Sequence, residues 1–136
     1  MSPLRRISLA GLIALMVGSG ILHLVKPAPY VKIVPRALGN AELYVFCSGI
    51  AEILAGVLLL IPATRRFGAK FTAVLLIAVF PANVQMALDG AVPDRGFLAG
   101  SDLMLWLRLP VQPLLIYWAW TFAKHRAEVT ETRPTT

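Results

Sequence analysis

The chain has 136 residues, of which 57% are hydrophobic and 15% are charged, and its mean hydropathy is +0.72. This composition excludes an ordinary soluble domain of this size and predicts a single membrane-embedded domain. The net charge of +6 does not indicate nucleic-acid binding, because most basic residues lie at the ends of apolar runs, as they do in membrane proteins.

The first element in the chain is a short basic head over residues 1–6, followed by an apolar run over residues 7–25. The same order describes a signal peptide, but the run is longer than a signal core and no A-x-A-like site follows it. We therefore expect a first membrane-spanning helix, with His23 near its far end. The connector over residues 26–41 is rich in proline, which disfavours a continuous helix. Its apolar side chains predict a segment that lies on the membrane surface or caps the bundle.

The rest of the chain predicts three more membrane-spanning helices, at about residues 42–61, 67–88 and 103–123. Their lengths suit a bilayer, and the short connection between the second and third helices predicts antiparallel neighbours. Residues 89–102 form a polar turn, and residues 124–136 form a polar cytoplasmic tail. The predicted fold class is all-α: a four-helix transmembrane bundle over residues 7–123.

The distribution of lysine and arginine predicts the orientation of this bundle. Four spans place both termini on one side of the membrane, and the more basic side is normally cytoplasmic. The side that carries the termini has Arg5, Arg6, Arg65, Arg66, Lys70, Lys124, Arg126 and Arg133, whereas the opposite loops have Lys26, Lys32, Arg36 and Arg95. Both termini are therefore predicted to be cytoplasmic.

Polar residues inside the predicted spans fall in the outer half of the membrane. Glu52 is about 15 Å deep at 1.5 Å per residue, and an ionisable group at such a depth costs roughly 2.5–3.5 kcal/mol, so it normally has a partner. We expect that partner to be Arg108. All four helices contribute to this outer-half group: His23 from the first, Ser48 and Glu52 from the second, Asn83 from the third, and Arg108 and Gln112 from the fourth.

Each of these residues also has a purely structural interpretation. Arg108 near a helix end often extends to the membrane surface, and a Glu52–Arg108 pair can serve bundle specificity alone. His23 can be an interfacial hydrogen-bonding residue. Asn83 can satisfy a carbonyl that Pro81 frees. The single cysteine, Cys47, excludes a CxxC redox pair and is predicted to be a small buried hydrophobic residue.

Several strings are similar to those of the DoxX-like family of small bacterial membrane proteins. The strings are GILHLVKPAPYVKIVPRAL, SGIAEILAGVLLLIPATRR, FPANVQMAL and WLRLPVQ, and the resemblance covers about residues 20–119. It implies a four-helix membrane bundle. The family positions carried over to this chain are His23, Pro27, Tyr30, Pro35, Ser48, Gly49, Glu52, Pro81, Asn83, Met86, Trp106, Arg108, Pro110 and Gln112. These include the outer-half polar group and add Tyr30 to it.

The family takes its name from a subunit associated with a thiosulfate:quinone oxidoreductase, and other members are linked to oxidative-stress complexes. A related branch uses cysteine pairs, which this chain lacks. No metal site is expected, since His23 and His125 should lie on opposite sides of the membrane. No cofactor is evident in the residues, although a quinone is compatible with them.

The functional hypothesis is an accessory membrane subunit with a polar outer-half pocket and no catalytic activity of its own. The pocket would bind a quinone or another amphiphile head group, with Arg108 as donor and Glu52 as counter-charge or proton acceptor. The alternative is a structural or assembly partner of another membrane complex, without a ligand. The expected partners are the lipid bilayer and another membrane subunit or oxidoreductase, with no nucleic acid.

Overall fold

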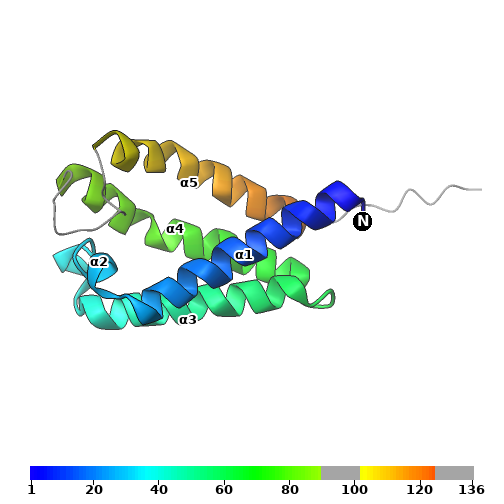
Figure 1. The fold of residues 1–136 in the computed structure, drawn as a ribbon, viewed down its shortest axis with the longest axis horizontal. Helices are drawn as coiled ribbons and strands as arrows, with labels where there is room; N and C mark the ends of the chain where they lie inside the picture. The colour runs from blue at the N-terminus through cyan, green and yellow to red at the C-terminus, as the bar shows by residue number, and fades with distance from the viewer. Residues whose placement is uncertain (90–101, 125–136) are drawn as a thin grey trace, which may run out of the picture.

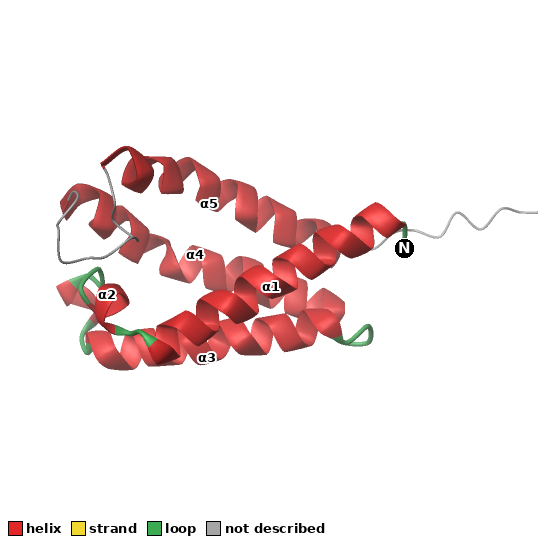
Figure 2. Cartoon of the chain, in the orientation of Figure 1, coloured by secondary structure: helices red, strands yellow, loops and turns green. Residues whose placement is uncertain are grey.

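The computed structural model describes residues 1–89 and 102–124. The predicted polar turn after Asp89 and the predicted tail after Lys124 lie outside the described residues. Within them, all regular structure is helical (Figure 2). The elements are α1 (Pro3–Val25), α2 (Ala28–Val31), a 3-10 turn η1 (Arg36–Leu38), α3 (Ala41–Leu60), α4 (Arg65–Asp89) and α5 (Asp102–Ala123).

The long helices agree with the predicted spans to within two residues, except at the start of α1. That helix begins at Pro3, so the basic head predicted over residues 1–6 largely belongs to the helix. The reason is local: the Ser2 side chain accepts a hydrogen bond from the Arg5 backbone amide, and proline suits the first helical position. The connector is broken into α2 and η1, in line with its prolines.

Three of the helices, α1, α3 and α4, are long and apolar enough to cross a membrane. Helix α5 is similar in length but carries Arg108, Gln112 and two prolines, which lower its hydropathy. The large apolar side chains exposed on the helices include Ile50, Leu54, Val74, Ile77, Leu107 and Leu114. Such a surface is typical of a protein that faces lipid.

The helices pack as two pairs, α1 with α3 and α4 with α5, and α3 joins the pairs by its contact with α4 (Figure 1). Helix α1 runs diagonally, so its start meets the end of α5. There the Arg5 guanidinium donates to the Thr121 carbonyl at 2.8 Å, and the Trp118 indole donates to the Ser8 hydroxyl at 2.8 Å. The α2 segment lies at the opposite end of the molecule (Figure 1).

The interior is divided into an apolar half and a polar half. At the end that carries the chain start, the core consists of Leu9, Leu12, Met16, Ala55, Leu59, Ala69, Ala73, Ala119, Phe122 and Ala123. The half nearer α2 holds buried Glu52, Ser48 and Gln112, with a small apolar cluster around Met86. Buried Thr72 lies nearer the start of α4, where its hydroxyl donates to the Gly68 carbonyl of its own helix. The molecule therefore has the uneven distribution of polar groups that the sequence predicts.

Helices α1 and α3 come into backbone contact where Gly20 and Gly49 face each other. A Cβ atom added at Gly20 would lie 2.6 Å from the Gly49 carbonyl oxygen, and one added at Gly49 would lie 2.8 Å from the His23 Cβ. Small residues at helix crossings allow such backbone contact in membrane proteins. His23 follows Gly20 by three positions and Glu52 follows Gly49 by three, so the crossing brings these two side chains together.

Cys47 does not lie where the sequence predicts. It is exposed rather than buried, because its side of α3 points away from the bundle.

Candidate functional site

A cavity of about 220 Å³ lies between the helices in the polar half of the molecule. Its walls come from α1, α2, α3, α4 and α5, and apolar side chains such as Leu15 and Leu115 line it beside the polar ones. The structure brings all of the sequence-predicted site residues to this one space: His23, Tyr30, Ser48, Glu52, Asn83, Arg108 and Gln112.

Glu52 is the most deeply buried ionisable residue of the cavity, with 5% of its surface exposed. Its Oε2 lies 3.4 Å from the His23 Nδ1. That nitrogen is also 2.8 Å from the Ser19 carbonyl oxygen, and a carbonyl only accepts, so Nδ1 carries the hydrogen and donates it to Ser19. Within the described part of the chain, Glu52 Oε2 has no hydrogen-bond partner. His23 therefore faces the carboxylate without satisfying Oε2, while the Ser19 side chain hydrogen-bonds the same carboxyl group.

The predicted ion pair between Glu52 and Arg108 is wrong. Arg108 is half-buried, and its Nη1 donates to the Met86 sulfur at 3.7 Å. The physical reason is the order of the helices: α5 packs on α4, which supplies Met86, whereas α1 packs on α3 and supplies His23. A thioether is a weak acceptor, so this contact leaves the guanidinium available to a stronger acceptor in the cavity.

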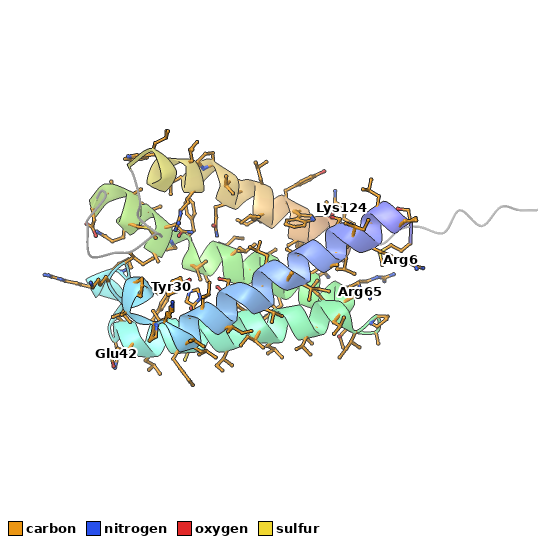
Figure 3. The ribbon with its side chains drawn as sticks, in the orientation of Figure 1. Arg6, Tyr30, Glu42, Arg65 and Lys124 are labelled. Carbon is orange, nitrogen blue, oxygen red and sulfur yellow. The ribbon has the colours of Figure 1, made fainter. Side chains whose placement is uncertain are left out.

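Tyr30 closes the cavity from the connector. Its ring stacks on the His23 ring with centroids 3.9 Å apart and planes inclined by 26°. Burial, and next the negative charge of Glu52, raise the pKa of the Tyr30 hydroxyl, and the positive charge of Arg108 opposes them. The phenol therefore keeps its proton and can donate it in a hydrogen bond. Figure 3 shows Tyr30 at the end of the molecule opposite Arg6, Arg65 and Lys124.

Two amide side chains connect α4 to α5 on another wall of the cavity. Asn83 Nδ2 donates to Gln112 Oε1 at 3.0 Å, and Gln112 Nε2 donates to the Leu76 carbonyl at 2.6 Å. The structural interpretation of Asn83 has it satisfy a carbonyl that Pro81 frees; in the structure Asn83 instead donates to Gln112, which donates to the Leu76 carbonyl. These amides satisfy each other and the backbone, so their geometry indicates a structural role.

Tyr44 is a cavity residue that the sequence reasoning missed. Its hydroxyl donates to the Ala78 carbonyl at 2.9 Å and so joins α3 to α4. Ser48, one turn further along α3, donates to the Val45 carbonyl at 3.3 Å. Tyr44, Ser48 and Glu52 are spaced four residues apart on one helix face. That spacing was a signal that could have identified Tyr44.

Gln112→Leu is expected to lower the free energy of unfolding by about 1–3 kcal/mol, because it removes the partner of the Leu76 carbonyl and of the Asn83 amide. Thermal or denaturant unfolding in detergent micelles measures the loss. Gln85 is the matched control, since its side chain bonds only on the surface, to Asp89, and Gln85→Leu should change stability by less than about 0.5 kcal/mol. Equal effects of the two substitutions would contradict the structural role of Gln112.

The chemistry of the cavity is that of a binding site with separate acceptor and donor ends. Glu52 supplies an acceptor, and Arg108 and Tyr30 supply donors. Within residues 1–89 and 102–124 no group of three or more His, Cys, Asp or Glu side chains is placed to hold a metal ion. Because the cavity offers both an acceptor and donors, it can hold a small polar group that both donates and accepts hydrogen bonds.

Comparison with protein-family models gives a match that covers most of the chain. The model of a family described as a domain of unknown function (DUF8561) matches residues 12–123, which extend from α1 to the end of α5. No curated protein and no solved structure matches the chain.

Proposed function

We propose that this chain, which belongs to the DUF8561 family, is an integral membrane protein whose cavity binds the polar head group of an amphiphile. All four long helices would cross the bilayer in this proposal. Helix α5 supports this assignment by its side-chain distribution. Its Gln112 is buried toward the other helices, whereas Leu107, Leu114 and Trp120 are exposed as lipid-facing residues would be.

The observation that carries the proposal is the unpartnered oxygen of Glu52. A buried acceptor without a donor costs about 1–3 kcal/mol, and native proteins satisfy nearly all such groups. A network built only to hold the helices together would satisfy Glu52 as it satisfies Gln112. A ligand that donates to Glu52 and accepts from Arg108 or Tyr30 removes the cost.

The size of the cavity limits what it can hold. At about 220 Å³ it is smaller than the roughly 300–1,000 Å³ of sites for drug-sized molecules, so it suits a head group rather than a whole lipid. A quinone-type ring is our candidate, in keeping with the predicted resemblance to the DoxX-like family. The same resemblance motivates the role of accessory subunit to a membrane oxidoreductase in the bacterial plasma membrane.

Calorimetric titration of the purified protein with decylubiquinol, a quinol ring on a ten-carbon chain, tests the proposal. We expect saturable binding of one molecule per chain. Arg108→Ala should weaken it at least about tenfold, because a hydrogen bond to a charged group contributes about 1.5–3 kcal/mol. Arg36→Ala is the matched control, an exposed arginine outside the cavity, and should bind as the wild type does. No binding by folded wild-type protein, or equal binding by Arg108→Ala, would contradict the proposal.

The second candidate function is a structural partner of another membrane complex, without a ligand. The bonds from Gln112 to Leu76 and from Tyr44 to Ala78 favour it, because they join neighbouring helices. This function predicts that His23→Leu combined with Glu52→Leu leaves the activity of the partner complex intact. The reason is that buried ion pairs are often replaceable by apolar residues. A folded double variant without activity would count against it.

The proposal includes an orientation with both termini in the cytoplasm. Arg6, Arg65 and Lys124 gather at one end of the molecule and Tyr30 and Glu42 at the other (Figure 3), a distribution that supports the positive-inside assignment. Green fluorescent protein fused after Thr136 should fluoresce, and periplasmic alkaline phosphatase fused there should be inactive. The reverse pair of results would contradict this orientation.

A further inference from the structure

An apolar hollow of about 430 Å³ lies on the outside of the molecule between α3 and α4. We call it the α3–α4 groove; its apolar lining includes Leu38, Leu43, Cys47, Ala51, Leu75 and Ala78. Leu43 is 58% exposed and Ala78 is also exposed, so the groove opens on the surface that faces lipid. The groove forms because the side chains of Ala51 and Ala78 are small and larger ones, such as Leu43 and Leu75, flank them.

The α3–α4 groove adjoins the polar cavity. Tyr44, Ser48 and Val79 line both spaces, so only one layer of side chains separates them. The cavity side of that layer faces Glu52 and Arg108, and the groove side faces a lining that is apolar apart from Asn40, Tyr44 and Ser48. An amphiphile has the same order of polarity, from a polar head to an apolar chain.

We propose that the α3–α4 groove holds the apolar chain of the ligand whose head group occupies the cavity, and that the ligand enters sideways from the bilayer between α3 and α4. This inference rests on the proposed function and adds to it the class of ligand, a single-chain amphiphile, and its path. The cavity is too small for head and chain together, so the chain must leave it through one of the walls.

Three of the other sides of the cavity are less suitable for an apolar chain. The Gly20–Gly49 contact closes α1 against α3, and the bond from Gln112 to the Leu76 carbonyl is buried between α4 and α5, whereas the bond from Tyr44 to the Ala78 carbonyl between α3 and α4 is exposed. A larger hollow of about 620 Å³ lies beside α2, but it shares only His23 with the cavity and has Lys32 and Glu42 in its lining. Charged side chains there favour water or lipid head groups. The groove between α3 and α4 has no charged residue in its lining.

The single cysteine provides a direct test, because Cys47 is exposed and lines the α3–α4 groove. The measurement is the rate at which N-ethylmaleimide alkylates Cys47 in the full chain. The probes are decylubiquinol and its chain-free analogue 2,3-dimethoxy-5,6-dimethylhydroquinone. Both should bind by calorimetry, and saturating decylubiquinol should slow alkylation several-fold while the chain-free quinol leaves the rate unchanged. Equal protection by both, or by neither when both bind, would overturn the inference.

Filling the α3–α4 groove gives a second test. Ala51→Phe and Ala78→Phe should weaken binding of decylubiquinol by about tenfold, because overpacking excludes the chain, and should not alter binding of the chain-free quinol. Ala14→Phe is the control, on an exposed position of α1 outside both spaces, and should change neither affinity. If these two substitutions leave the affinity for decylubiquinol unchanged, the groove does not hold the chain. That result would not contradict the proposed head-group site. If the wild type binds neither quinol, both proposals fail.

Discussion

Glu52→Gln is expected to abolish the preference of the cavity for a reduced ligand. In its ionised form the Glu52 carboxylate only accepts hydrogen bonds, so it favours a quinol hydroxyl and disfavours a quinone oxygen, which also only accepts. Wild-type protein should therefore bind decylubiquinol about tenfold more tightly than decylubiquinone, for a difference of one hydrogen bond to a charged group. Glutamine brings an amide donor of nearly the same shape, so the variant should bind the quinone at least as tightly as the quinol.

Anaerobic calorimetric titrations of both redox forms measure this preference as a ratio of two dissociation constants. Glu42→Gln is the matched control, because Glu42 is exposed at the start of α3 and does not line the cavity. Its ratio should equal that of the wild type. The same ratio in wild type and Glu52→Gln would contradict the assignment of Glu52 as the acceptor, since circular dichroism can establish that the variant is folded.

Gly49→Leu is expected to cause the largest loss of stability among the substitutions considered. The new Cβ would lie 2.8 Å from the His23 Cβ and 3.0 Å from the Gly20 carbonyl oxygen, and one of these contacts is with backbone that cannot rotate away. Forcing extra atoms into a packed interior costs typically about 1–3 kcal/mol, and more where backbone must move. The same shift should separate His23 from Glu52 and weaken ligand binding.

Thermal unfolding in detergent micelles measures the effect of Gly49→Leu. Gly18 provides the control, because nothing lies within 4 Å of a Cβ added at that position. Gly18→Leu should be neutral or stabilising, since leucine has the higher helix propensity. If the two leucine variants unfold at the same temperature, the close crossing of α1 and α3 is not what holds this bundle together.

The sequence predicts the helices well because each span is a continuous apolar run bounded by prolines or charges. The depth of polar residues along those runs also predicts which side chains share the cavity. The depth of a residue gives its position along the membrane normal, but it does not say which helices are neighbours in the bundle. The sequence therefore predicts a partner for Glu52 on α5, which carries an arginine at a similar height, whereas the long helices that pack on α3 are α1 and α4.

The signal for the correct neighbour was present in the glycines. Gly20 and Gly49 each precede a polar residue by three positions, and only the pairing of two such sites predicts that His23 meets Glu52. A single glycine does not predict a helix crossing, because the sequence does not distinguish it from a glycine at the surface, such as Gly18. Cys47 illustrates the same difficulty, since hydropathy does not distinguish a side chain that faces lipid from one that faces the core.

The most direct test of the central claim is native mass spectrometry of the protein extracted from its own membrane. The central claim is that the space beside Glu52 holds a ligand rather than only the helices' own side chains. Wild-type protein is expected to carry one amphiphile per chain, and Arg108→Ala is expected to lose it while Arg36→Ala retains it. A wild-type protein that carries no amphiphile, or an Arg108→Ala variant that carries the same one, would contradict the claim.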